Sequence, residues 1–99
     1  MDKVSTPTER VQAGMRLLDE RGPEGWADRL DLEKLDMDSC FLCVLGQLSG
    51  TFAEGWHVFD MTPDEIRNGG FAAYLPKAAR PLTRAWVKAI KRRRDVSGK

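Results

Sequence analysis

The tetrapeptide pattern T-P-x-E occurs twice in this sequence, at residues 6–9 and 62–65. The pattern is typical of a helix N-terminus, because the threonine hydroxyl and the glutamate carboxylate each accept a backbone N–H at the helix start. Proline is tolerated at the first helical position, because the backbone N–H that it lacks would have no hydrogen-bond partner there. Gly22 and Pro23 end the first segment, and residues 68–70, Asn-Gly-Gly, end the second. The sequence therefore predicts two helices with well-defined ends.

The most apolar stretch of the chain is residues 40–49, CFLCVLGQLS. On a helical wheel its apolar residues cover most of the circumference, and a helix that is apolar nearly all round is buried. Asp38 or Ser39 can cap this helix and Gly50 can end it, so we expect it to be central in the fold. Glycine destabilises a helix interior, so Gly46 needs a packing reason. It predicts that the backbone of a neighbouring segment approaches the helix closely at this position.

A second apolar stripe lies near the C-terminus, where Leu82, Trp86 and Ile90 recur at helical spacing. This stripe predicts a helix over residues 81–94 that packs through the three side chains. Residues 95–99, DVSGK, have no such stripe, and we expect them to form a frayed tail.

Residues 24–37 fit neither a long helix nor a regular strand. We expect short helical turns at residues 26–30 and 32–35, with a short strand at residues 30–32 as the alternative. A chain of 99 residues is long enough for one core. The sequence therefore predicts an all-α, compact single domain over residues 1–99, with four to six short helices around the buried central helix.

Both cysteines of the chain, Cys40 and Cys43, form a C-x-x-C pair. A structural zinc site needs four ligands; a set of Cys40, Cys43, His57 and Asp60 is conceivable, but it lacks the paired second half that makes a zinc motif specific. A thioredoxin-like redox pair follows a strand in a βαβ unit, which this sequence does not show. Free cysteine is among the most buried residue types. We therefore expect two buried, reduced cysteines, with no metal site and no cofactor.

His57 is the single histidine of the chain. No serine, cysteine or acid lies at a spacing from it that would indicate a nucleophile for this histidine. No glycine-rich phosphate loop follows a strand. The sequence therefore predicts no catalytic residue, and we expect a non-enzymatic protein.

The formal net charge of +1 hides a strong asymmetry along the chain. Residues 1–76 contain seven basic and fourteen acidic side chains, a balance of −7, whereas residues 77–99 contain nine basic and one acidic, a balance of +8. A block of one charge either meets a polyanionic partner or neutralises acidic side chains of the same molecule. The candidate partner-binding residues are Arg84, Lys88, Lys91, Arg92 and Arg94.

Four roles are open for this basic face: a solvated surface, nucleic-acid binding, docking to an acidic protein, or contact with a membrane surface. Clustered cations suit phosphates, but this cluster lacks interleaved aromatic residues and a recognisable DNA-reading motif. The longest apolar run, residues 40–45, is too short to span a bilayer, and the start MDKVSTPTER has no apolar signal segment. We expect a cytoplasmic protein without a membrane partner.

The segment RLDLEKLDMDSCFLCVLGQLSGTFAEG, residues 29–55, resembles an uncharacterised family of small proteins from actinobacteriophages and actinobacteria. The upstream LLDERGPEGW is also similar, so the resemblance covers residues 14–71 and excludes the basic C-terminal helix. The matching positions are Leu30, Asp31, Leu35, Asp36, Cys40, Cys43, Val44, Leu45, Gly46, Gln47, Leu48, Gly50, Phe52 and Gly55.

This resemblance implies a short, phage-encoded accessory protein in the host cytoplasm, a class that commonly acts by binding a macromolecule. It implies no particular activity. Together with the basic C-terminal block, it leads us to predict a non-enzymatic protein that binds a host or phage protein. The alternative is a DNA- or RNA-binding module that uses the basic C-terminal helix.

Overall fold

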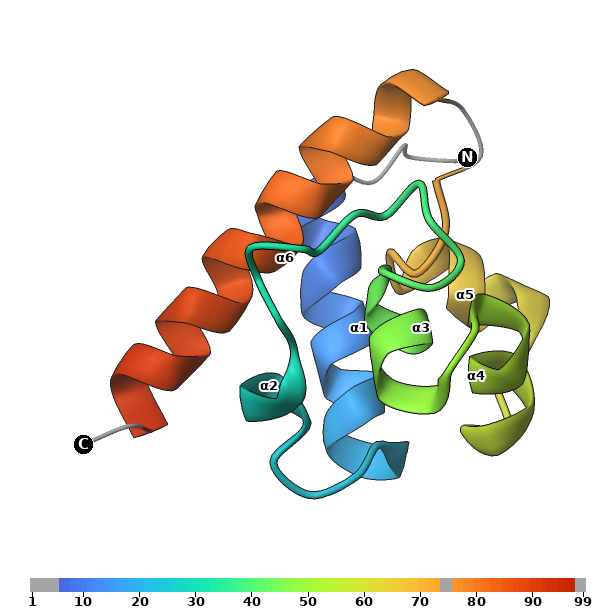
Figure 1. The fold of residues 1–99 in the computed structure, drawn as a ribbon, viewed down its shortest axis with the longest axis horizontal. Coiled ribbons are helices and arrows are strands. Elements are labelled where there is room, and N and C mark those ends of the chain that lie inside the picture. Colours follow the sequence, from blue (N-terminus) through green and yellow to red (C-terminus); the bar gives the residue numbers. More distant parts are fainter. Residues whose placement is uncertain (1–5, 74–75, 98–99) are drawn as a thin grey trace.

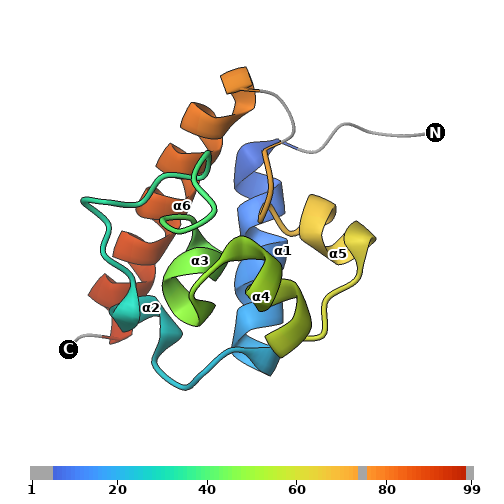
Figure 2. The same cartoon turned by 45° about the vertical axis from the view of Figure 1, so that its right-hand side comes forward.

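The computed structural model describes residues 6–73 and 76–97, which form six α-helices and no strand. The helices are α1 (Pro7–Arg21), α2 (Trp26–Arg29), α3 (Val44–Ser49), α4 (Phe52–Val58), α5 (Pro63–Asn68) and α6 (Pro76–Ser97). The long helices α1 and α6 lie side by side, α5 packs on α1 away from α6, and α3 packs against α4 (Figures 1 and 2). The predicted all-α architecture is confirmed, and the alternative strand at residues 30–32 does not form.

Both predicted capping boxes form, so the local sequence sets where α1 and α5 begin. The Thr6 hydroxyl accepts the Glu9 N–H and the Glu9 carboxylate accepts the Thr6 N–H, each at 3.1 Å. Thr62 and Glu65 repeat the pattern at 3.1 and 3.0 Å. Each box gives partners to two backbone donors that a helix start leaves free.

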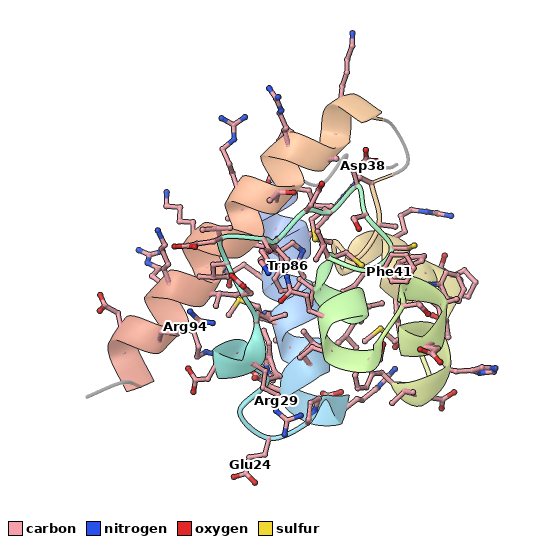
Figure 3. All side chains as sticks on the ribbon, viewed as in Figure 1. Glu24, Arg29, Asp38, Phe41, Trp86 and Arg94 are labelled. Carbon is pink, nitrogen blue, oxygen red and sulfur yellow. The ribbon has the colours of Figure 1, made fainter. Side chains whose placement is uncertain are left out.

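Trp86, on the inner face of α6, is fully buried and points into the interior of the molecule (Figure 3). Its ring centroid lies 5.5 Å from that of Phe71 and 6.4 Å from that of Trp26, which it meets edge-on. Its indole N–H donates to the Gly70 carbonyl at 2.7 Å, so this buried polar atom has a partner. Gly14 of α1 faces the ring, because a Cβ there would lie 3.0 Å from two ring carbons. The whole predicted stripe is buried: Leu82, Trp86 and Ile90.

Helix α6 is longer than predicted at both ends. It begins at Pro76 instead of near Pro81. It continues to Ser97, so the prediction of a frayed tail is wrong for residues 95–97, which are helical. Residues 98 and 99 lie outside the described part. Pro81 is exposed and removes one helical hydrogen bond, a loss that the packing of the rest of the helix overcomes.

The central helix predicted over residues 40–49 starts later than expected. Helix α3 begins at Val44, and its N-cap is Cys43, whose sulfur accepts the Gly46 N–H at 3.3 Å. Upstream, the Ser39 hydroxyl accepts the N–H groups two and three residues later, at 3.2 and 3.0 Å. Ser39 therefore holds a separate turn and does not cap the helix, as serine side chains often do when they bond to nearby backbone.

This later start divides the apolar segment into an exposed and a buried half. Phe41 and Leu42 are 62% and 38% exposed, whereas the following helix is buried through Val44, Leu45 and Gly46. A Cβ on Gly46 would lie 2.6 Å from the Phe41 carbonyl oxygen, so the predicted close approach is confirmed. The neighbour is the turn that immediately precedes the helix.

The connection between α2 and α3 is held to α6. Helix α2 confirms the first predicted helical turn, but residues 32–34 form an isolated turn and no helix. Leu35 and Met37 are buried, and the Met37 N–H donates to the Thr83 hydroxyl of α6 at 3.0 Å. Residues 30–37 thus run beside α6, and the segment then turns toward α3 (Figure 1).

We expect Trp86→Ala to lower the free energy of unfolding by about 3 to 5 kcal/mol, because it leaves a cavity against α1 and unpairs the Gly70 carbonyl. Chemical denaturation followed by circular dichroism measures the change. Val58→Ala is the control: Val58 is 65% exposed, and its loss should change the free energy by less than about 0.5 kcal/mol. Equal stability of the two variants would contradict the burial of this tryptophan.

Candidate functional site

The face of α6 opposite Trp86 is a continuous row of exposed cations, which we call the basic stripe. At about 100° per residue its members cover an arc of about 120° centred opposite the buried tryptophan. Nitrogen-tipped side chains project from this edge of α6 away from the rest of the molecule (Figure 3). The basic stripe consists of Lys77, Arg80, Arg84, Lys88, Lys91 and Arg92.

Within residues 6–73 and 76–97, no member of the basic stripe forms an ion pair or a side-chain hydrogen bond. The acidic side chains of the described residues therefore do not neutralise these cations at short range. Four of the five residues that the sequence nominated belong to this surface: Arg84, Lys88, Lys91 and Arg92. Lys77 and Arg80 join them because α6 starts earlier than predicted.

Arg93 is turned toward the body of the protein. Its guanidinium binds both carboxylate oxygens of Asp19 on α1, at 2.9 and 3.0 Å, and lies 5.7 Å from the centre of the Trp26 ring. The Trp26 indole N–H also donates to Asp19, at 3.1 Å. The hydrogen bond from Arg93 is the main reason why the pKa of Asp19 is lowered. This network joins α1, α2 and α6.

Arg94 is the one nominated residue that the structure separates from the others. Its guanidinium donates to the Ala27 carbonyl at 3.0 and 2.7 Å and to the Leu30 carbonyl at 2.6 Å. These carbonyls lie at the C-terminal end of α2, where a helix leaves acceptors without partners. Figure 3 shows Arg94 directed toward α2, so its charge is used inside the molecule.

A groove of about 430 Å³ runs between α1 and α6 beside the basic stripe. Its floor is apolar, with Val11 and Met15 from α1 and Ala85 and Ala89 from α6. Among the described residues, no acidic side chain lines the groove. Its rim consists of the polar lining residues, four of which are cations: Thr8, Gln12 and Arg16 of α1, and Lys88, Arg92 and Arg93 of α6.

The two cysteines lie in different environments. Cys43 is buried as predicted, and burial raises the pKa of its thiol. Cys40 is exposed, so the prediction that both are buried is wrong for this residue, because it lies in the turn before α3. Both are free thiols. Across the described part of the chain, no group of three or more His, Cys, Asp or Glu side chains is placed to hold a metal ion.

The groove and the inward arginines were missed at the sequence level. Ala85 and Ala89 are one helical turn apart beside the basic positions, but this spacing alone does not indicate a groove. Their partners across the groove, Val11 and Met15, are 70 or more positions away in the sequence. Only the packing of α1 on α6 brings the four together.

Comparison of the chain with protein-family models, with curated proteins and with solved structures gives no match. Within the described ranges, no helix combines the length and the hydrophobicity needed to cross a membrane.

Adjacent arginines of α6 should differ sharply in their contribution to stability. We expect Arg94→Gln to lower the free energy of unfolding by about 1 to 3 kcal/mol, because it leaves the Ala27 and Leu30 carbonyls without their charged donor. Arg92→Gln, the matched control on the exposed side, should change it by less than about 0.5 kcal/mol. Urea denaturation of both variants tests this, and equal values would contradict the inward role of Arg94.

The two thiols should differ in reactivity. In the native protein we expect one thiol to react rapidly with Ellman's reagent and the second to react only after unfolding, because burial keeps Cys43 protonated and shielded. Cys40→Ala should abolish the rapid phase. Two rapid thiols, or a rapid phase that survives this substitution, would show that Cys43 is accessible. We also expect EDTA to leave the melting temperature unchanged.

Proposed function

We propose that this chain is a non-enzymatic, phage-encoded accessory protein that acts by binding a host or phage protein through the exposed side of α6. The phage origin rests on the sequence resemblance alone. The observation that carries the binding proposal is the basic stripe, six exposed cations without an ion pair among the described residues, lying beside an apolar groove.

The combination of groove and stripe favours a protein partner. Protein interfaces combine an apolar buried core with a polar rim, and the groove between α1 and α6 has this arrangement. A phosphate backbone is recognised by cations and backbone donors and gains nothing from an apolar floor. Cations at the rim would accelerate association with an acidic protein.

Nucleic-acid binding is the second candidate, because the basic stripe also suits a row of phosphates. From Lys77 to Arg92 the helix rises by about 22 Å, and Arg80, Arg84, Lys88 and Arg92 follow one another every four residues, about 6 Å apart. Such a row can neutralise several phosphates without reading the base sequence.

The triple variant Arg84→Glu, Lys88→Glu, Lys91→Glu tests both candidates. Exposed charges contribute only about 0 to 1 kcal/mol each, so we expect a nearly unchanged melting temperature. If the partner is a protein, capture of that partner from host lysate is lost, and neither the parent nor the variant binds labelled DNA or RNA. If the partner is a nucleic acid, the parent binds the labelled probe more weakly as salt rises, and the variant does not bind it.

The matched control reverses three exposed cations on other surfaces: Arg29→Glu, Lys34→Glu, Arg67→Glu. Both triple variants lower the formal net charge by six units, from +1 to −5, and change it on different surfaces; the control also removes the exposed contact of Arg67 with Asp64, at 4.0 Å. The control should keep the partner. If both triple variants behave like the parent in every assay, the basic stripe is only a solvated surface and the proposal is wrong.

A further inference from the structure

We propose that the groove between α1 and α6 receives an amphipathic α-helix of the partner protein, with an apolar stripe flanked by acidic side chains. This inference rests on the proposed function and specifies the chemistry of the partner.

The floor of the groove is suited to an apolar stripe. Val11 and Met15, one turn apart on α1, close the bottom of the groove and are almost fully buried, whereas the half-buried Ala85 and Ala89, one turn apart on α6, give it an accessible apolar side. The two alanines leave room for side chains that enter from outside. Val96, at 77% exposed, extends the apolar lining into solvent at the end of α6. A third helix laid along this furrow would pack ridges into grooves as helices of a bundle do.

The rim of the groove selects the charge of the occupant. Lys88 and Arg92 stand on the α6 side and Arg16 on the α1 side, and none of them pairs with an acid of the described residues. Cations on both sides of an apolar floor complement a helix whose leucine-type positions are bordered by glutamate or aspartate.

A helical occupant fits this surface better than an extended peptide. An extended peptide gains affinity by adding to a sheet edge, and residues 6–73 and 76–97 contain no strand. A helix satisfies its own backbone hydrogen bonds and needs only side-chain contacts from the groove.

The binding test uses three fluorescein-labelled probes with the full chain. The first is a 15-residue peptide with leucines at helical i, i+3, i+4 and i+7 spacing and glutamates beside them. The second has the same composition in an order that spreads the leucines round the helix. The third is a short DNA duplex. Fluorescence anisotropy measures each dissociation constant, and circular dichroism confirms that every variant is folded.

Two double variants carry the same charge change on the same helix. Lys88→Glu, Arg92→Glu alters the rim, and Lys77→Glu, Arg80→Glu alters the part of the basic stripe that does not line the groove. We expect the parent to bind the first peptide and not the second. The rim variant should weaken this binding by about tenfold or more, and the other variant by less than about threefold.

Three results would overturn the inference: equal binding of both peptides, equal loss in both double variants, or binding of the duplex alone. Light scattering that shows a dimer disrupted only by the rim variant would also overturn it, because a second copy of the chain would then occupy the groove. If the peptides fail while the triple reversal of Arg84, Lys88 and Lys91 still abolishes capture of a protein, the helix inference is wrong and the proposed function stands.

Discussion

The insertion of the Trp86 ring between α1 and residues 70–71 is the contact on which the rest of the structure depends. The ring touches aromatic side chains from two separate segments, and its N–H has a backbone acceptor. It approaches α1 closely because residue 14 has no side chain. A side chain at position 14 would meet the Gly69 carbonyl first and the Trp86 ring next, and a smaller residue at position 86 would leave a cavity between the two long helices. Since both helices line the groove, the shape of the candidate site follows from this one contact.

Two neighbouring arginines then set the rotation of α6 about its own axis. Arg93 binds Asp19 of α1, and Arg94 binds carbonyls at the end of α2. With these side chains directed inward and Trp86 buried, helix geometry directs the basic stripe outward. The run of three arginines at residues 92–94 is therefore not one surface feature. Two of its members stabilise the fold, and Arg92 is available to a partner.

Features set by interactions between residues close in the sequence could be predicted. Features set by a competition between two possible helix caps, or by packing between distant segments, could not. The capping boxes at Thr6 and Thr62 use neighbours three residues apart, and the stripe through Trp86 uses helical periodicity. The start of α3 was missed because the side chains of both Ser39 and Cys43 can cap a helix. Polarity favours serine as the cap, whereas in the structure the Cys43 sulfur caps the buried helix and the Ser39 hydroxyl holds the turn before it. The groove was missed because its two sides come from residues 8–16 and 85–96, which are far apart in the sequence.

The charge separation along the chain persists in the folded protein, and it determines what the proposed partner would have to supply. Intramolecular pairing uses the cations nearest the acidic body: Arg93 pairs with Asp19, and Arg94 lies 3.8 Å from Asp28. The basic stripe points away from that body, so folding leaves these charges solvated and mutually repulsive. An acidic partner would relieve the repulsion and, by covering the apolar floor, remove Val96 and its neighbours from water. Because charges at the rim remain near solvent, association should be fast and weakened by salt, while the apolar contacts should determine how long the complex lasts.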